Sequence, residues 1–567
     1  MRGLLFLQLP QLDNDLADAS ENVPLASVYL RFALESSRER RYWETVLKPP
    51  AIEDNDDQTL TDWIVNQDPS AIACTLYVWN IERTLAVLRR VRCALPRVRI
   101  VAGGPEVARG HPFLFRSGAI DVAVEGEGEP VFADILKALR LGRTTGFRTV
   151  AHARAGSWTW GTREPESRPL DALLPPPGYP GYAPVDGMAY LETTRGCPLR
   201  CVYCRYPHQH RGISCLSVEE ASRRIQAFRE QGARGIRFID PTFNANPAFE
   251  PILEACLNLN ADRKLAFFAE LNAATLTPRQ ARLLARARFM EVEVGVQSRD
   301  RSVLRRIRRF DRLQAVDRGI HLLLKQRIRV TVDLMMGLPG QTAREIERSV
   351  KWALRLPRAD VQCLQTLLLP GTDIRRFRRP WGLKAMNRPP YGVLSTPTLS
   401  PTVMARTLSN VRRWMGVDMD CPTCQFVGRS MSDLFADRTT VRVLGKTVTA
   451  LDDAQLHAAR RAIVFHGKNL MHAAPAINRT IRQWVRQEPH GLWQFVFRLE
   501  WEEPLDLLEG VIATLRKASA HVLDRRLAVD TGQRMAARRV LIQLVPGRRY
   551  DPGWVAAIND LLRRCFF

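Results

Sequence analysis

The sequence lacks any long hydrophobic run. Nowhere in its 567 residues does an apolar stretch approach the ~20 residues that a membrane-spanning helix needs. The apolar segment at residues 3–10 is too short to form the core of a secretory signal followed by a cleavage site. These absences predict a chain without a membrane span, and we expect it to be cytoplasmic.

Cysteine is also scarce, with 11 in the whole chain. In a long chain without a secretory signal, cysteines more often remain reduced and serve metal binding or catalysis than form disulfides. There is no internal repeat and no low-complexity tract. The chain therefore looks like several ordinary folded domains rather than a repeat array or a disulfide scaffold.

Charge of one sign is in excess, but it is not concentrated. The 83 Lys and Arg exceed the 59 Asp and Glu, which gives a net charge of +24. Such a balance raises the possibility of a nucleic-acid or membrane-surface partner. No basic tail is present, and no arginine-rich block is interleaved with aromatics. We favour a solvated, arginine-rich surface over a nucleic-acid partner, which stays an alternative.

Residues 1–140 alternate short apolar runs with amphipathic stretches, which predicts a doubly wound, Rossmann-like parallel α/β domain. Ligands bind such sheets at the carboxyl ends of the strands. Three distinctive loops follow predicted strands, at residues 75–80, 103–105 and 125–129. Their glycines would let a bulky ligand approach the backbone. Taken one at a time, each loop could equally be a tight turn.

The rest of the chain divides into three further parts. Residues 141–187 are expected to be a linker, since residues 175–181 are rich in proline and glycine. Residues 188–400 alternate strand and helix about six times, which fits a full or partial barrel. Residues 401–567 predict a small α/β or mainly helical domain over the barrel mouth.

A cysteine cluster follows the first strand expected in the barrel. Cys197, Cys201 and Cys204 are spaced four and three residues apart, and thiolates suit iron–sulfur clusters. Three ligands for a four-iron cluster leave one iron open, as a catalytic metal requires. The alternative is a structural zinc site with His208 or His210 as fourth ligand.

This C-x3-C-x2-C motif resembles the signature of the radical S-adenosylmethionine (radical SAM) superfamily. The resemblance implies a partial (β/α)6 barrel, a 4Fe–4S cluster on the three cysteines, and S-adenosylmethionine chelated by the open iron. Tyr203 matches the position that touches the adenine. Further cofactor contacts are implied at strand ends, with Asp240 replacing the usual glutamate. The other such positions are Glu270, Gln297 and Ser298.

The first domain resembles the cobalamin-binding domain that precedes the barrel in class B radical SAM methyltransferases. The cofactor-binding positions implied by this resemblance lie in the three loops named above: Thr75, Tyr77, Trp79, Gly103, Gly104, Pro105, Glu125, Gly126 and Glu127. The Asp-x-His-x-x-Gly motif that binds cobalt from below in other cobalamin proteins is absent, and His111 lies in a different context. The resemblance then implies cobalt without a protein ligand below. A degenerate domain that no longer binds cobalamin is the alternative.

Together the resemblances imply a cobalamin-dependent radical SAM methyltransferase. It would C-methylate an unactivated carbon of a small-molecule or peptide natural-product intermediate, through a 5′-deoxyadenosyl radical and methylcobalamin. An external flavodoxin- or ferredoxin-type protein would supply electrons. The alternatives are ring contraction, cyclisation or other carbon-skeleton chemistry on the same cofactors, RNA modification, and a non-catalytic cobalamin or iron sensor.

A second cysteine pair lies near the C-terminus. Cys421 and Cys424 form a bare C-x2-C, and only Cys565 remains downstream. The pair could join an auxiliary cluster or zinc site. We favour two unrelated thiols.

Overall fold

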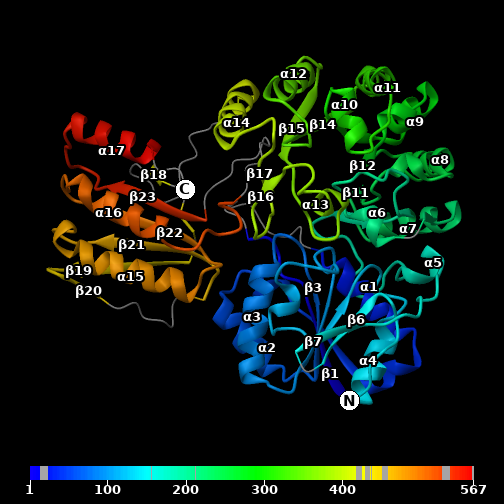
Figure 1. Cartoon of the computed structure of the whole chain (residues 1–567), viewed down its shortest axis with the longest axis horizontal. Coiled ribbons are helices and arrows are strands. Elements are labelled where there is room, and N and C mark those ends of the chain that lie inside the picture. Colours follow the sequence, from blue (N-terminus) through cyan, green and yellow to red (C-terminus); the bar gives the residue numbers. More distant parts are fainter. Residues whose placement is uncertain are drawn as a thin grey trace.

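The computed structural model describes residues 1–12, 23–154, 156–210, 212–416, 424–427, 434–435, 437–449, 457–525 and 537–564. Figure 1 shows three lobes in chain order: a first α/β sheet, an open barrel above it, and a second α/β sheet beside both. Cys421 and Cys565 lie outside the described residues, and Cys424 begins strand β18 (Cys424–Val427).

The first sheet contains seven strands in the order β2-β1-β3-β4-β5-β6-β7. The strands from β2 to β5 run parallel, and β6 and β7 are antiparallel to their neighbours. Their bounds are β1 Arg2–Leu7, β2 Trp43–Leu47, β3 Ala71–Thr75, β4 Arg99–Gly103, β5 Val122–Val124, β6 Val150–Arg154 and β7 Ser157–Trp160. The longest helices between them are α1 Leu25–Glu35, α2 Asp57–Asn66, α3 Ile81–Ala94 and α4 Phe132–Arg140.

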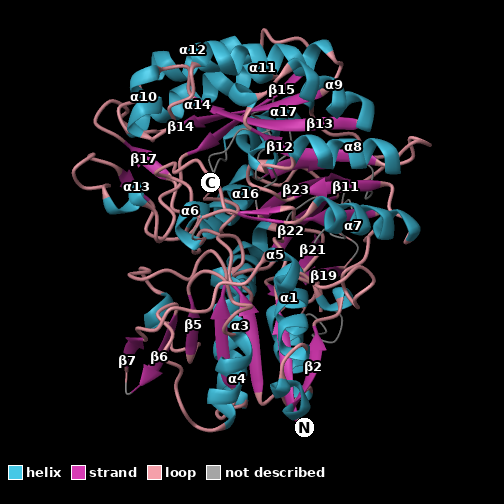
Figure 2. Ribbon diagram, turned by 90° about the vertical axis from the view of Figure 1, so that its right-hand side faces the viewer, coloured by secondary structure: helices cyan, strands magenta, loops and turns pink. Residues whose placement is uncertain are grey.

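Strand β1 lies between β2 and β3, so the strand order reverses beside it. In open parallel sheets such a reversal leaves a crevice at the carboxyl ends, where ligands bind. Figure 2 shows these strands rising toward the barrel, with their carboxyl ends at the junction of the two lobes. Strand β3 is buried along its whole length, as expected for a parallel strand covered on both faces.

The barrel is an open sheet of six parallel strands in the order β15-β14-β13-β12-β11-β8. Its strands are β8 Met188–Leu191, β11 Gly235–Phe238, β12 Ala266–Leu271, β13 Phe289–Gln297, β14 Arg329–Met336 and β15 Ala359–Gln365. The outer helices are α7 Val218–Glu230, α8 Phe249–Leu259, α9 Pro278–Ala287, α10 Arg301–Arg306, α11 Leu313–Lys325, α12 Ala343–Ala353 and α14 Pro401–Met415. Capping boxes start α9 at Thr277 and α12 at Thr342, because each threonine accepts from the backbone of the third helical residue.

The first sheet and the barrel share a buried core. Val28 and Tyr29 of α1 belong to the same cluster of buried apolar side chains as Leu191 and Phe228 of the barrel. Burying apolar surface across this junction stabilises one arrangement of the two lobes.

The third lobe is a six-stranded sheet in the order β18-β23-β22-β21-β19-β20, packed against α15 Ala474–Gln487 and α16 Leu505–Arg516. Its strands are β19 Arg438–Leu444, β20 Thr447–Val448, β21 Arg460–His466, β22 Leu492–Leu499 and β23 Arg538–Leu544, and helix α17 (Pro552–Arg564) follows them. The buried Asp56 pairs with Arg461, which joins this lobe to the first one.

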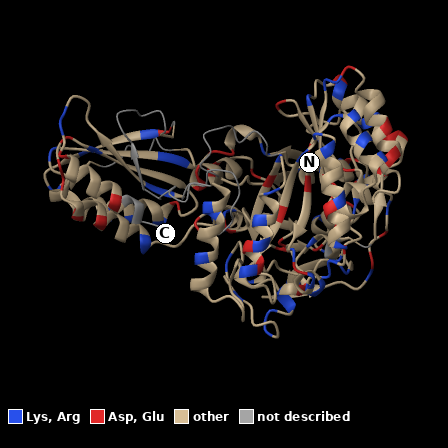
Figure 3. Ribbon diagram, turned by 90° about the horizontal axis from the view of Figure 1, so that it is seen from above, with Lys and Arg blue, Asp and Glu red and all other residues tan. Residues whose placement is uncertain are grey.

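The predicted fold class is confirmed: a doubly wound domain, a partial barrel and a third α/β lobe. The division of the chain at residues 140, 187 and 400 stays a proposal. Within the expected linker, β6 and β7 extend the first sheet, because β6 pairs with β5 and β7 pairs with β6. No described helix is long and apolar enough to cross a membrane. In Figure 3 basic and acidic segments are interspersed over the lobes seen from that side.

Candidate cofactor site

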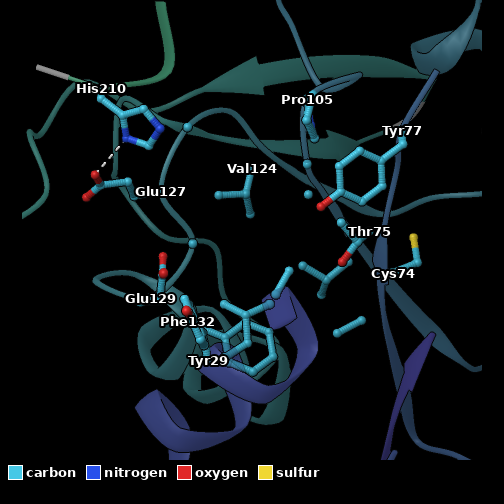
Figure 4. A pocket seen from close by; sticks show the side chains of 18 of the residues that line it. Tyr29, Cys74, Thr75, Tyr77, Pro105, Val124, Glu127, Glu129, Phe132 and His210 are labelled. Carbon is cyan, nitrogen blue, oxygen red and sulfur yellow. Dashed lines mark hydrogen bonds and ion pairs between the residues drawn. The ribbon is translucent and has the colours of Figure 1, made fainter. Parts of the chain in front are cut away.

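A pocket lies at the carboxyl ends of β3, β4 and β5. Its empty space of about 1000 Å³ includes the solvent at its open mouth. One wall comes from the first domain and the other from the segment that follows β8 of the barrel (Figure 4). Of the predicted cobalamin contacts, seven line the pocket: Thr75, Tyr77, Gly103, Gly104, Pro105, Gly126 and Glu127.

Two adjacent glycines give the pocket its backbone wall. A Cβ on Gly103 would meet no atom within 4 Å, and because Gly103 lines the pocket, such a side chain has room there. Gly104 has φ +100°, and a Cβ there would lie 2.7 Å from the carbonyl oxygen of Leu76. Only glycine therefore suits this turn.

The loop after β3 is built around Asn80. Its Oδ1 accepts from the Tyr77 backbone N–H at 2.8 Å, and its Nδ2 donates to the carbonyl of Leu9 at 2.9 Å. Tyr77 is held with its ring stacked on Trp79, with centroids 4.4 Å apart and planes 7° apart. Trp79 is thus placed behind Tyr77 and is not among the pocket-lining residues.

The opposite wall carries charged groups from both lobes. His210 Nδ1 lies 2.9 Å from Glu127 Oε1, and Figure 4 shows this pair facing the wall that carries Tyr77. Arg195 binds Glu192 through two hydrogen bonds and Glu129 through one at 3.0 Å. Burial alone would raise the pKa of Glu127, but His210 and Arg195 outweigh that effect and hold it below its usual value.

The three cysteines lie on one loop, residues 196–213, which we call the cluster loop. Strands β9 (Thr194–Arg195) and β10 (Ser214–Cys215) close its base. Gly196 has φ +96°, and a Cβ there would lie 2.1 Å from the Gly212 carbonyl oxygen, so this closure needs glycine. The barrel holds the loop's centre, because the Val202 carbonyl accepts from the backbone of Ile374 at 2.9 Å.

Burial sets the chemistry of the thiols. Cys201 is buried, and burial raises the pKa of Cys197 and raises that of Cys204 to about 12. Thiolates therefore form here only when a cation compensates their charge, as iron does. Within the described part of the chain no three His, Cys, Asp or Glu are placed to hold a metal ion. This arrangement supports neither ligand set over the other, so cluster ligation and the zinc alternative both stay predictions, and the side chain of His208 lies outside the described part.

Arg309 joins the cluster loop to the end of β13. Its Nη1 lies 4.0 Å from Cys201 Sγ, and its Nη2 donates to the Gly295 carbonyl at 2.6 Å. The predicted ribose contacts, Gln297 and Ser298, follow directly, with Gln297 at φ +65° and Ser298 fully buried. Tyr203 lies near Arg309 and Cys201. Burial raises the pKa of Tyr203, the nearby Cys201 raises it further, and Arg309 lowers it.

Two predicted carboxylates differ in their surroundings. Asp240 is fully buried, and its oxygens accept from the backbone N–H of Thr193 at 2.7 Å and from its hydroxyl at 2.5 Å. These contacts fix the strand end that precedes the cluster loop. Glu270 keeps a solvent-exposed surface, but the protein packed around its carboxyl, together with nearby Glu293, raises its pKa to about 7. Whether either one binds S-adenosylmethionine stays a prediction.

His111 does not line the pocket and cannot contact a ligand there. It is buried away from it, with Nε2 3.1 Å from Glu106 and Nδ1 accepting from the Leu114 backbone at 3.0 Å. Glu106 also accepts from the Tyr391 hydroxyl at 2.8 Å, so this group joins the first domain to the segment after the barrel. Glu125 likewise lies outside the lining and pairs with Arg205.

Comparison with known proteins agrees with this geometry. Residues 191–353 match the model of the radical SAM superfamily, and residues 34–136 match that of the B12-binding domain. The chain thus carries a radical SAM domain, preceded by a B12-binding domain. This combination of domains confirms the prediction of a radical SAM enzyme and the predicted cofactors, a 4Fe–4S cluster, S-adenosylmethionine and cobalamin.

Two curated relatives are methyltransferases. The cobalamin-dependent radical SAM methyltransferase TokK of Streptomyces tokunonensis is 27% identical over 59% of this radical SAM chain and 52% of its own. A 2-(S-pantetheinyl)-carbapenam-3-carboxylate methyltransferase of Streptantibioticus cattleyicolor is 26% identical over 54% of this chain and 48% of its own. The chain thus spans about half the length of each.

A solved structure shares the fold. The radical S-adenosylmethionine methyltransferase TsrM of Kitasatospora setae, with tryptophan and a SAM analogue bound, matches with a TM-score of 0.57 and 16% identity. The match covers 71% of this radical SAM chain and 80% of that one.

The residues present fit a corrin and a cluster. Gly103 leaves room in the pocket, and the loop beside it carries one buried and two partly buried thiols. Sequence reasoning missed the second wall, because its members lie far from the first domain in sequence: Glu192, Arg195 and His210. It also missed Arg309, whose only signal was an arginine after the fourth barrel strand.

Proposed function

We propose that this radical SAM enzyme methylates an unactivated carbon of a small-molecule or peptide intermediate. One observation carries the proposal: the pocket is walled on one side by the carboxyl ends of β3–β5 and on the other by residues that flank the cysteines. A corrin in this pocket would lie beside the cluster loop. The two curated methyltransferases to which this chain is similar support methyl transfer as the outcome.

When bound, the cluster and S-adenosylmethionine supply a 5′-deoxyadenosyl radical, and cobalamin supplies a transferable methyl group. The chain's own residues hold and shield these groups. Gly103 and Gly104 would let the corrin lie against the backbone, and the stacked Tyr77 forms a firm aromatic surface at its edge. Packing of the cluster loop against the barrel, with Cys201 buried, would limit the access of water to the reacting groups. We assign electron supply to a flavodoxin- or ferredoxin-type protein.

The test is anaerobic reconstitution with iron, sulfide and hydroxocobalamin, followed by S-adenosylmethionine, a reductant and candidate substrates. We expect both 5′-deoxyadenosine and S-adenosylhomocysteine, with a product heavier by one methylene unit. In Cys201→Ala we expect loss of the cluster and of 5′-deoxyadenosine. A full complement of cluster iron in that variant would contradict the ligand assignment.

The reaction product distinguishes methylation from the alternative functions. A substrate converted without gain of a methylene unit, with 5′-deoxyadenosine formed, would replace methylation by ring contraction or cyclisation on the same cofactors. Both cofactors bound without any cleavage of S-adenosylmethionine, across substrates and reductants, would indicate a sensor.

A further inference from the structure

Two buried arginines connect the cluster loop to the cobalamin pocket. Arg195 stands at the base of the loop, two residues before Cys197, and Arg205 follows Cys204 directly. Each is only 6% exposed. Their side chains leave the barrel and end on backbone and carboxylate oxygens of the first domain.

Arg205 reaches three acceptors in that domain. Its Nε donates to the Pro105 carbonyl at 3.2 Å, and its Nη2 donates to the Val107 carbonyl at 2.8 Å and to Glu125 Oε1 at 3.1 Å. It passes Gly371 of the barrel closely, since a Cβ there would lie 2.2 Å from Arg205 Nη1. The glycine thus leaves the space that the guanidinium occupies.

Arg195 has a similar arrangement on the other side of the loop. Glu192 of the barrel holds one edge of its guanidinium at 3.0 and 2.8 Å, and Nη1 donates to Glu129 of the first domain at 3.0 Å. Burial opposes its charge, but Glu129 and Glu192 raise the pKa of Arg195 well above its usual value. It therefore remains a cation.

The acceptors belong to the loops that form the pocket. Pro105 and Glu129 line it, and Glu125 directly precedes the lining residue Gly126. Each arginine therefore ties a cysteine-bearing loop to a corrin-binding loop. A planar guanidinium with several fixed donors holds such a position more firmly than an ammonium group.

We propose that Arg195 and Arg205 are positioning residues that couple the two cofactor sites, so that ordering of the cluster loop by its cluster strengthens cobalamin binding. Coupling of this kind is reciprocal: cobalamin must then stabilise cluster binding by the same factor. The proposal concerns cofactor binding alone and holds whatever product the enzyme makes.

The test measures the affinity for hydroxocobalamin anaerobically, by quenching of tryptophan fluorescence, in cluster-free and cluster-loaded full-length protein. In the wild type we expect binding about fivefold or more tighter with the cluster. In Arg205→Gln we expect the ratio of the two dissociation constants to fall below about twofold, because the link between the loops is lost. Arg205→Lys, which keeps the charge but loses the fork, should give an intermediate ratio.

The ratio separates coupling from general destabilisation, which weakens both affinities alike and leaves the ratio unchanged. Gly371→Ala displaces the guanidinium without replacing Arg205, at a cost in stability because Gly371 has φ +79°. If Arg205→Gln does not fold, Arg205→Lys decides the matter, and a wild-type ratio in that variant counts against the proposal. Arg223→Gln is the matched control, since Arg223 pairs with Glu220 at 2.6 Å on an exposed helix face of the barrel. A wild-type ratio near one, or a wild-type ratio retained in Arg205→Gln or Gly371→Ala, would overturn the proposal.

Discussion

Replacing Arg309 with Gln should make the cluster harder to reduce. Arg309 is largely covered, with 11% of its side chain exposed, and its Nη1 lies 4.0 Å from Cys201 Sγ. Reduction adds a negative charge to the cluster, and a nearby cation stabilises the reduced form. Glutamine removes the charge yet can still donate to the Gly295 carbonyl. Asp311, which pairs with Arg309 at 3.4 Å, would then keep its hydrogen bond from Asn272 but lose this cation, and its negative charge would add to the effect.

The size of the shift follows from Coulomb's law. At an effective dielectric of about 20, two unit charges 4 Å apart interact by about 4 kcal/mol, and at about 8 Å by about 2 kcal/mol. The second distance allows for charge spread over the cluster. With about 1.4 kcal/mol per 59 mV for one electron, the potential should fall by about 80–170 mV.

An anaerobic redox titration followed by electron paramagnetic resonance of the reduced cluster measures this potential. Arg308→Gln serves as the matched control, because Arg308 is 44% exposed and pairs with Asp373 at 2.6 Å. Its shift should be about 20 mV or less, since exposed paired charges are screened. A potential that is unchanged or higher in Arg309→Gln would refute the reasoning, and with it the placement of the cluster beside Cys201.

Two further predictions concern the pocket and the strand end beneath the cluster loop. Gly103→Leu should abolish cobalamin binding at near wild-type stability, because its side chain enters open space in the pocket. Gly104→Ala should cost about 2–4 kcal/mol of folding stability, because this position has positive φ and the new Cβ would clash with Leu76. Equilibrium dialysis measures the binding and denaturant unfolding the stability, and tight cobalamin binding by Gly103→Leu would contradict the site. Burial raises the pKa of Asp240 from 3.8 to about 7, so the folded state holds the proton more tightly, and this group's contribution to stability falls as pH rises through that window. Relative to Asp240→Asn, the wild type should lose about 3 kcal/mol between pH 5 and 8 in denaturant unfolding, and parallel pH profiles would count against it.

Local sequence patterns predicted much of the fold, and they predicted the part of the site that the first domain contributes. The buried run of β3 and the glycines at 103–104 are written in contiguous residues, and so is the spacing of Cys197, Cys201 and Cys204. Such features can be read from sequence because hydrophobic period, backbone conformation and ligand spacing are local properties. Seven of the nine predicted corrin contacts accordingly line one pocket.

Contacts between residues far apart in the sequence could not be predicted from such local patterns. Arg205 finds Pro105 a hundred residues away, and His210 finds Glu127, only because two lobes pack together. The hydrogen bond from the Thr193 backbone to Asp240 likewise depends on tertiary packing. In the expected linker, the alternation at 150–160 was masked by the proline-rich stretch that follows it, so β6 and β7 went unrecognised.

The junction between the lobes decides which residues can tune the chemistry. Parallel sheets bind ligands at their carboxyl ends, and here the pocket is bounded by such ends from the first domain and by the segment after β8 of the barrel. The strands themselves only fix where the loops begin. The separation of the two cofactors therefore depends on side chains that span the junction, chiefly Arg195 and Arg205, whose ends are fixed in both lobes. A substitution at either one should alter cofactor geometry without touching any predicted ligand.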